Sequence, residues 1–388
     1  MHGVDKASQL VDNSETLRTS LDEEIEVTSP RGRPSYLRSL NHRRFLQALR
    51  GNGPMSRSDL ARDLGMSKVT VSSIANDLLE RGVICEAGVS KQKIGRRAAL
   101  LDLGPQLGVV AAVDVDTQTI SARLADLRGE PIKDVRRDTP DDLGALVAVI
   151  ASFLVEAAGS CGRRVQDIRH VKIAVPASVE PSGVVSFAGM PKYIEGSALL
   201  TQLQTKLPGI GVSLVNDMNA ASIGEGRCGA ARRWSKFAYL GVRRSGTGMG
   251  LVLNGRLYQG ARGRAGEIGL LQLGHEPNAL DSILSKHDAR TLNELARVLA
   301  TAFVLLDLEG IVIYTQLREG IDWFAQLEAH LLGMVPYPVC LTESELGDRA
   351  PLVGAIVLAL DQVWKNPDFH MRRQESQPQS RLVMHARG

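Results

Sequence analysis

Two short amphipathic helices joined by a glycine turn limit the possible folds of this chain more than any other feature of its sequence. Ser56 is a suitable N-cap for the first helix, and Ser67 for the second, which runs to Glu80. Gly65 lies between them. Apolar side chains recur at helical spacing in both segments: Leu60, Leu64, Val71, Ile74 and Leu78. Two helices joined by a tight glycine-containing turn predict a helix-turn-helix unit.

The neighbouring segments extend this unit to a winged domain. Residues 36–53 predict a preceding helix that is stopped by two glycines. Residues 83–88 and 98–104 predict two strands around a loop rich in lysine and arginine. We therefore expect a winged helix-turn-helix domain at residues 29–105.

Positive charge is concentrated in this domain. Residues 29–100 contain fourteen lysines and arginines against five acids, although the formal net charge of the whole chain is only +3. Residues 1–28 contain seven acids and two bases, and predict an acidic, disordered tail. A basic module beside a nearly neutral body is typical of polyanion binding. A generic helical bundle with a polar face would explain the helices but not the basic wing, so the sequence favours binding to double-stranded DNA.

The candidate DNA-binding residues occupy the second helix of the motif, the wing and the segment before the domain. The helix and wing carry hydrogen-bonding or basic side chains at the expected positions: Ser67, Lys68, Thr70, Ser72, Ser73, Asn76, Lys91, Lys93, Arg96 and Arg97. Upstream, Arg31 and Arg33 in the sequence PRGRP have two interpretations. They lie in a narrow A·T minor groove, or they form a stiff basic linker.

The rest of the chain alternates predicted strands and helices, which indicates an α/β domain at residues 106–364. Strand-like segments occupy 109–138, 171–179, 212–217 and 237–260; helices occupy 141–158 and 352–364; and a helix followed by a strand occupies 291–315. The polar segment 365–388 predicts a disordered tail.

Composition excludes several classes of protein. A chain of 388 residues with 44% hydrophobic and 23% charged residues is typical of a folded protein with more than one domain. No stretch reaches about 18 uninterrupted apolar residues, and the N-terminal residues contain no apolar segment behind a basic start, as a secretory signal would, so we expect a cytoplasmic protein without a membrane partner. Its four cysteines lie far apart without a CxxC pair, which argues against a disulfide framework.

Three strings, in this order, resemble the ROK family of bacterial sugar kinases and sugar-responsive transcriptional regulators. They are VNDMNAASIGEG (215–226), SGTGMGLVLNGRLYQGARGRAGEIG (245–269) and LGDRAPLVGA (346–355). The resemblance covers about residues 36–364. It implies an α/β fold in which a winged helix-turn-helix precedes a two-lobed domain of the actin-like ATPase or RNase H-like type.

The resemblance also implies a ligand site, formed by Asn216, Asp217, Gly246, Thr247, Glu267 and Asp281. In kinase members the residue that matches Asp217 is the general base, whereas without phosphoryl transfer it is only a hydrogen-bond acceptor. Each assignment has a structural alternative. Asp217 is also a good helix N-cap, the glycines around 246–250 suit an ordinary hairpin, and Glu267 could be a surface loop acid.

Departures from the family pattern argue against catalysis. Where kinase members have a Gly-Gly-Thr turn, this chain has Asp116, whose charge disfavours a phosphate, so we expect no ATP, no cofactor and no catalytic residue. The family's zinc ligands are also replaced, because Leu270 stands at the histidine position and no cysteine follows until Cys340. We therefore expect no bound metal.

The leading interpretation is a transcriptional regulator, acting as a repressor of carbohydrate uptake or catabolism genes. Its effector would be a sugar or sugar phosphate, and a homodimer or higher homo-oligomer would pair two DNA half-sites. Two other interpretations stay open: an ATP-dependent sugar kinase with an added DNA-binding domain, and a constitutive DNA-binding protein whose second domain only dimerises.

The metal prediction has a direct test. We expect the purified protein to contain no stoichiometric zinc and a chelator to leave its stability unchanged, because a zinc site needs about four ligands that this segment lacks. Elemental analysis measures the zinc content. One zinc ion per chain would contradict our interpretation of residues 270–281.

Overall fold

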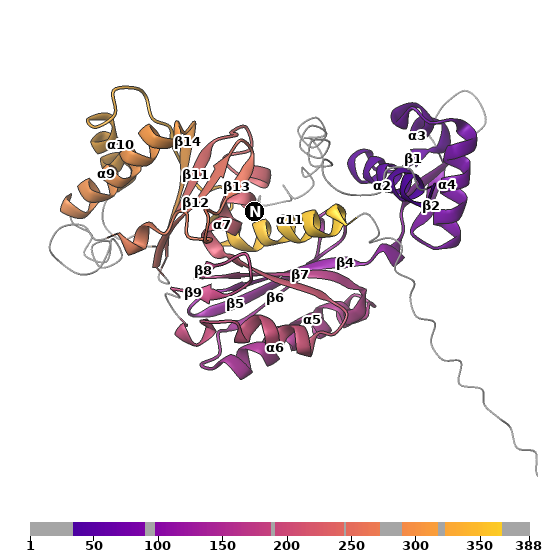
Figure 1. Cartoon of the computed structure of the whole chain (residues 1–388), viewed down its shortest axis with the longest axis horizontal. Coiled ribbons are helices and arrows are strands. Elements are labelled where there is room, and N and C mark those ends of the chain that lie inside the picture. The colour runs from indigo at the N-terminus through magenta and orange to yellow at the C-terminus, as the bar shows by residue number, and fades with distance from the viewer. Residues whose placement is uncertain are drawn as a thin grey trace, which may run out of the picture.

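The computed structural model describes residues 34–89, 98–187, 191–243, 246–271, 289–316 and 323–366. They form a small N-terminal domain, here called the head, and two lobes that are each built on a β-sheet (Figure 1). Several predicted features lie outside the described residues: the acidic segment 1–28, the tail beyond Asn366, and Arg31, Arg33, Lys91, Lys93, Arg96, Arg97 and Asp281.

The head is the predicted winged helix-turn-helix. Its elements are α2 (Pro34–Asn52), β1 (Met55–Ser56), α3 (Arg57–Leu64), α4 (Lys68–Glu80), β2 (Ile84–Val89) and β3 (Ala99–Leu103). The hydroxyl of Ser56 accepts a hydrogen bond from the Asp59 amide over 3.2 Å, and that of Ser67 accepts one from the Thr70 amide over 3.0 Å. Gly65 ends α3 with φ 61°, a conformation that favours glycine. Both predicted caps are confirmed.

The two lobes repeat one sheet topology. Lobe 1 has the strand order β10-β7-β4-β5-β6 and lobe 2 the order β13-β12-β11-β14-β15. In chain order, each lobe begins with three antiparallel strands. The next two strands of its sheet run parallel to the first of these three. The strands are β4 (Val109–Val115), β5 (Thr119–Ala125), β6 (Pro131–Asp138), β7 (Ile168–Val175), β10 (Gly211–Asn216), β11 (Phe237–Arg243), β12 (Gly246–Leu253), β13 (Arg256–Tyr258), β14 (Gly310–Thr315) and β15 (Leu341–Glu343).

Helices cover the outer side of each lobe. α5 (Leu143–Ser160) and α6 (Ala198–Lys206) belong to lobe 1, and α9 (Ala289–Leu306) and α10 (Trp323–Leu332) to lobe 2 (Figure 1). Among the described helices, α5 alone is long and apolar enough to cross a membrane. It instead buries Leu146, Ile150 and Leu154 in the core of lobe 1, which accounts for its composition.

Two further helices, α7 (Asp217–Cys228) and α11 (Ala350–Lys365), lie side by side between the lobes (Figure 1). α7 follows the last strand of lobe 1 and packs on β11 and β12 of lobe 2, while α11 follows the last strand of lobe 2 and packs on β4 and β7 of lobe 1. Glycines allow this approach. A Cβ on Gly354 would lie 1.7 Å from the backbone oxygen of Ala220, and one on Gly224 would lie 2.6 Å from that of Ala350.

The head rests on lobe 1 and on the last turn of α11. Arg128, in the turn after β5, donates a hydrogen bond to the Leu49 oxygen over 3.0 Å. Trp364 donates one from Nε1 to the Leu127 oxygen over 3.1 Å, and the Arg50 guanidinium lies 5.0 Å from the centroid of its ring. One apolar cluster continues from the head into α11, so the head is not a loosely tethered unit.

Several details differ from the sequence prediction, which also contained no α6, α10 or β15. The strand predicted at 171–179 is divided into β7 and β8 (Ser178–Val179), because Pro176 lacks an amide hydrogen for the ladder. A second, two-stranded sheet pairs β8 with β9 (Val185–Ser186). The short strand β1, which pairs with β3, was not predicted, since two residues are too few to give a periodic pattern.

Because α7 and α11 are in close contact, one added methyl group between them should destabilise the protein strongly. Gly354→Ala should lower the free energy of unfolding by about 3 kcal/mol or more, because the new Cβ meets backbone that cannot move aside. Gly159→Ala in α5 is the matched control. A Cβ there meets nothing within 4 Å, so a gain of about 0.5 kcal/mol is expected. Chemical denaturation measures both, and equal effects would contradict the packing described.

Candidate functional site

The predicted ligand residues lie where the lobes meet. Asp114 is the second-last residue of β4, Asn216 ends β10, and Arg243 ends β11. The carboxyl ends of parallel strands commonly form the ligand crevice of an α/β sheet. This edge is therefore the candidate ligand site.

Asn216 uses its side chain to shape the site. Its Oδ1 accepts a hydrogen bond from the Asn219 amide over 2.9 Å, and its Nδ2 donates one to the Ala177 oxygen over 3.1 Å. Asn216 is thus the N-cap of α7, and Asp217 is the first residue of that helix. The capping role that was an alternative for Asp217 belongs to its neighbour.

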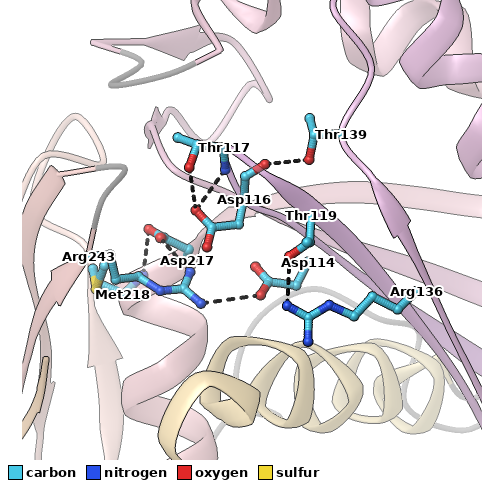
Figure 2. A network of polar contacts seen from close by, with 9 residues as sticks. All are labelled: Asp114, Asp116, Thr117, Thr119, Arg136, Thr139, Asp217, Met218 and Arg243. Atoms are coloured by element: carbon cyan, nitrogen blue, oxygen red, sulfur yellow. Dashed lines mark hydrogen bonds and ion pairs between the residues drawn. The ribbon is translucent and has the colours of Figure 1, made fainter. Parts of the chain in front are cut away.

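Asp217 is buried and engaged by both carboxylate oxygens. Oδ1 accepts a hydrogen bond from the Met218 amide over 2.9 Å, and Oδ2 lies 3.3 Å from Nη1 of Arg243. The same guanidinium places Nη2 3.5 Å from Oδ2 of Asp114 (Figure 2). Sequence reasoning did not identify Arg243 or Asp114 as site residues. A lone arginine at a strand end gives no pattern, because its partners lie 26 or more positions away in the sequence.

Burial dominates the electrostatics of this cluster. Loss of solvation raises the pKa of Asp114 to about 7 and that of Asp217 to about 6, although Arg243 opposes both shifts. Among the described residues, Asp114 Oδ1 and Arg243 Nε have no hydrogen-bond partner. The cluster therefore has unused capacity to accept and to donate a hydrogen bond.

Asp116 adds a third carboxylate beside the pair. Its Oδ1 accepts a hydrogen bond from the Thr117 amide over 2.7 Å, and its backbone oxygen accepts one from the Thr139 hydroxyl over 2.6 Å (Figure 2). Its negative charge contributes to the raised pKa of both Asp114 and Asp217. The turn therefore presents acid where a phosphate would need a donor.

Gly246 and Thr247 lie at the start of β12, in an antiparallel hairpin with β11. Nearby strand glycines face α7: a Cβ on Gly241 would lie 2.2 Å from the Met218 sulfur, and one on Gly248 would lie 2.9 Å from the Met218 side chain. The glycines of this segment thus have a packing role, and the hairpin alternative describes Gly246 and Thr247 well. Ligand contact by these two residues stays a prediction.

Glu267 reaches the opposite lobe. Its Oε1 accepts a hydrogen bond from the Ser178 hydroxyl over 2.6 Å. Ser178 directly follows Ala177, whose backbone oxygen accepts the hydrogen bond from Asn216. Arg264 reinforces this contact, because it lies 3.7 Å from Glu180. Its guanidinium also lies 4.7 Å from the centroid of the Phe187 ring. Asn216, Asp217 and Glu267 are therefore brought to one edge, while Asp281 lies outside the described residues.

A metal site is not formed in the part of the chain that the structure describes. No group of three or more His, Cys, Asp or Glu side chains there is arranged to hold an ion. The predicted lack of zinc concerns residues 270–281, most of which lie outside that part, so it stays a prediction.

The exposed side of α4 is the candidate DNA-reading surface. Ser67, Lys68, Ser73 and Asn76 are exposed, and Thr70 and Ser72 are half-buried. Two of these residues are held in place: the Thr70 hydroxyl lies 2.8 Å from the Ser67 hydroxyl, and Asn76 Oδ1 accepts a hydrogen bond from Arg57 over 3.0 Å.

Val69 is an additional candidate that sequence reasoning missed. It is 80% exposed in the first turn of α4, beside the polar residues just described. The sequence could have indicated this exposure, because Val69 does not belong to the helical repeat of buried residues Val71, Ile74 and Leu78. An exposed aliphatic side chain at this position suits contact with a thymine methyl group.

Comparison with known proteins matches both parts of the chain. Residues 110–279 match the model of the ROK family, and residues 38–84 match that of winged helix-turn-helix DNA-binding domains. The xylose repressor of Caldicellulosiruptor bescii is 27% identical over 241 residues, which are 61% of this chain and 60% of the repressor. The DNA-binding transcriptional dual regulator NagC of Escherichia coli is 25% identical over 249 residues, 62% and 59% of the two chains. The chain thus spans about three fifths of the length of these relatives.

Solved structures share the fold. A ROK family transcriptional regulator described as a homologue of the E. coli MLC protein has a TM-score of 0.63 at 20% identity, over 84% of this chain and 97% of that one. A ROK hexokinase from Thermus thermophilus has a TM-score of 0.55 at 23% identity, over 66% and 100%. The predicted fold class is confirmed, and it is shared by regulators and kinases.

The raised pKa values predict how stability depends on pH. Because the folded pKa of Asp114 is about 7, the folded state binds more protons than the unfolded state between about pH 4 and 7. The free energy of unfolding should therefore fall as pH rises through this window, with Asp217 contributing in the same direction.

Asp114→Asn should make the free energy of unfolding less dependent on pH. The change between about pH 4 and 7 should shrink by at most about 4 kcal/mol, since one pKa unit corresponds to about 1.4 kcal/mol. Denaturation at pH 5, 6 and 7.5 measures the slope. Asp307→Asn, at a side chain that is 94% exposed, is the control and should leave it unchanged. An unaltered slope in Asp114→Asn would contradict the assignment.

Proposed function

This chain combines a ROK family domain with an N-terminal winged helix-turn-helix domain, and from that combination we propose that it is a sugar-responsive DNA-binding repressor. A sugar or sugar derivative would bind between the lobes and change the affinity of the head for its operator. The observation that carries this proposal is the joint presence of an exposed reading helix and an interlobe site in one packed unit.

The reading surface supports the DNA-binding part. Exposed hydroxyl, amide and basic side chains of α4 suit major-groove base edges and phosphates, and Val69 adds an apolar contact. The two curated relatives compared above are named as a repressor and as a DNA-binding regulator. A homodimer in the cytoplasm, with one head on each half-site, is part of the proposal.

The interlobe edge supports the sugar-binding part. Sugar hydroxyls donate and accept hydrogen bonds, and acceptors lie on both lobes: the buried carboxylates of Asp114 and Asp217, and the half-buried carboxylate of Glu267. One relative is named for xylose, which favours a sugar as effector class.

A sugar kinase is the less favoured function. Asp217 pairs with Arg243, whose positive charge opposes the rise in the pKa of this carboxylate and so weakens it as a general base. Asp116 further disfavours nucleotide phosphates. Sugar-dependent release of ADP in a coupled assay would support the kinase instead.

The path from the site to the head runs through α7 and α11. Asp217 begins α7, α7 packs on α11 through Gly224 and Gly354, and Trp364 at the end of α11 lies under Arg50 of α2. A sugar that prefers one arrangement of the lobes would thereby shift the head between two positions. A sugar with equal affinity for both arrangements would not regulate DNA binding.

The DNA-binding proposal makes a prediction about α4. Thr70→Ala and Val69→Ala should each reduce the difference in binding free energy between operator and random DNA by about 1 to 3 kcal/mol, because each removes a base contact. Lys68→Ala should weaken both DNAs alike and reduce the slope of log affinity against log salt by about 1. The assay measures the affinity of each variant for random DNA and for operator fragments that genome-wide mapping of bound DNA has identified. Equal losses on both DNAs in all three variants would contradict the assignment.

The sugar-binding proposal is tested at Glu267, which takes no part in the Arg243 cluster. Glu267→Gln keeps an oxygen for the Ser178 hydroxyl but removes the charge that accepts from a sugar, at a cost of about 1.5 to 3 kcal/mol. Operator release, measured against a panel of sugars and sugar phosphates, should then need about ten- to a hundredfold more of the active compound.

The exposed Glu343→Gln in β15 is the matched control and should leave the curve in place. If no sugar releases the operator, the third interpretation, a constitutive DNA-binding protein, replaces this one.

A further inference from the structure

Arg243 places a buried positive charge where the two lobes meet. Its side chain is only 2% exposed, and it extends from β11 of lobe 2 toward Asp114, within β4 of lobe 1, and Asp217, directly after β10 (Figure 2). Nη2 lies 3.5 Å from Asp114 Oδ2, and Nη1 lies 3.3 Å from Asp217 Oδ2. Asp114 and Asp217 are themselves only 6% and 2% exposed.

The two carboxylates need a cation at this point. Two buried carboxylates that face one space repel each other strongly, and burial penalises each charge further. In proteins such pairs are neutralised by a proton, by a bound cation with oxygen ligands, or by a basic side chain. Here the third solution is present, and the guanidinium supplies it with two separate N–H groups, as its fork geometry allows.

The position of Arg243 is fixed by the backbone around it. Arg243 pairs with Gly246 in the β11–β12 ladder, and Gly241, two residues earlier, packs against Met218, the residue that follows Asp217. The distance between the end of β11 and the start of α7 is therefore set by close packing. A shorter basic side chain would not reach both carboxylates.

We propose that Arg243 is a built-in cation that holds lobe 2 against lobe 1, at the point where Asp114 and Asp217 would otherwise bind a divalent metal ion. Closure of the cleft in this chain then requires neither a metal nor a nucleotide. The proposal does not depend on a sugar or on DNA, and it would stand if the effector were of another class.

The consequence is that removal of the guanidinium creates a metal site. Arg243→Ala leaves two unpaired carboxylates around an empty volume, with Asp116 close enough to affect the pKa of both. Mn²⁺ is a suitable probe because it prefers carboxylate oxygens and is detected by its paramagnetism.

We expect electron paramagnetic resonance to show Mn²⁺ binding by the full-length Arg243→Ala chain at least tenfold more tightly than by the wild type. Without metal, the variant should have a larger radius of gyration than the wild type in small-angle scattering. Mn²⁺ should bring this radius back to the wild-type value and raise the melting temperature of the variant. Arg233→Ala, at an exposed position, is the control and should behave as wild type. The double variant Arg243→Ala/Asp114→Asn should lose the gained affinity.

Arg243→Lys keeps the test valid if Arg243→Ala does not fold. Its single ammonium group keeps the charge but reaches one carboxylate, so the variant should be less stable than wild type and still bind no Mn²⁺. The proposal is overturned if the wild type binds Mn²⁺ as tightly as Arg243→Ala does. It is also overturned if Arg243→Ala or Arg243→Lys keeps wild-type stability and dimensions without metal.

Discussion

The close contact between α7 and α11 is the constraint on which the rest of the structure depends. Each helix follows the last strand of one lobe and packs on the sheet of the other, so the pair joins two lobes of the same topology. Only glycine at 224 and 354 allows the backbones to approach to this degree. The same two helices carry the functional ends of the domain, since Asp217 begins α7 at the cleft and Trp364 lies near the end of α11, at the head.

The charges in the cleft give this arrangement its functional character. Asp217, the carboxylate at the start of α7, is paired with a guanidinium from the opposite lobe, which weakens it as a base. The buried carboxylates exceed the buried cations, and this makes the site a better acceptor of hydroxyl groups than of phosphates. The proposed response to a sugar and the proposed lack of phosphoryl transfer would then have one common physical cause, the identity of residue 243.

Periodic and capped segments were predictable from the sequence, and the interlobe contacts were not. Ser56, Ser67 and Gly65 identified the helix-turn-helix because caps and turns are local, and both sheets were recognisable from alternating apolar runs. Asn216, Asp217 and Glu267 were predicted as ligand residues from the family resemblance; the structure brings them to one edge, and their contact with a ligand stays a prediction. Arg243, Asp114 and Trp364 act through partners far away in the chain, so no spacing rule marks them. Val69 was missed for a different reason, because an exposed valine has no partner to indicate its role.

The central claim is that the interlobe site and the head respond as one unit, and hydrogen exchange measured by mass spectrometry on the full chain tests it most directly. Replacement of Arg243 by alanine weakens the cleft without touching α11 or the head. The account predicts faster amide exchange in α7, in the last turns of α11 and in the C-terminal turn of α2, where Arg50 meets Trp364, with α4 unchanged. Faster exchange in α7 together with wild-type exchange in α11 and α2 would contradict it.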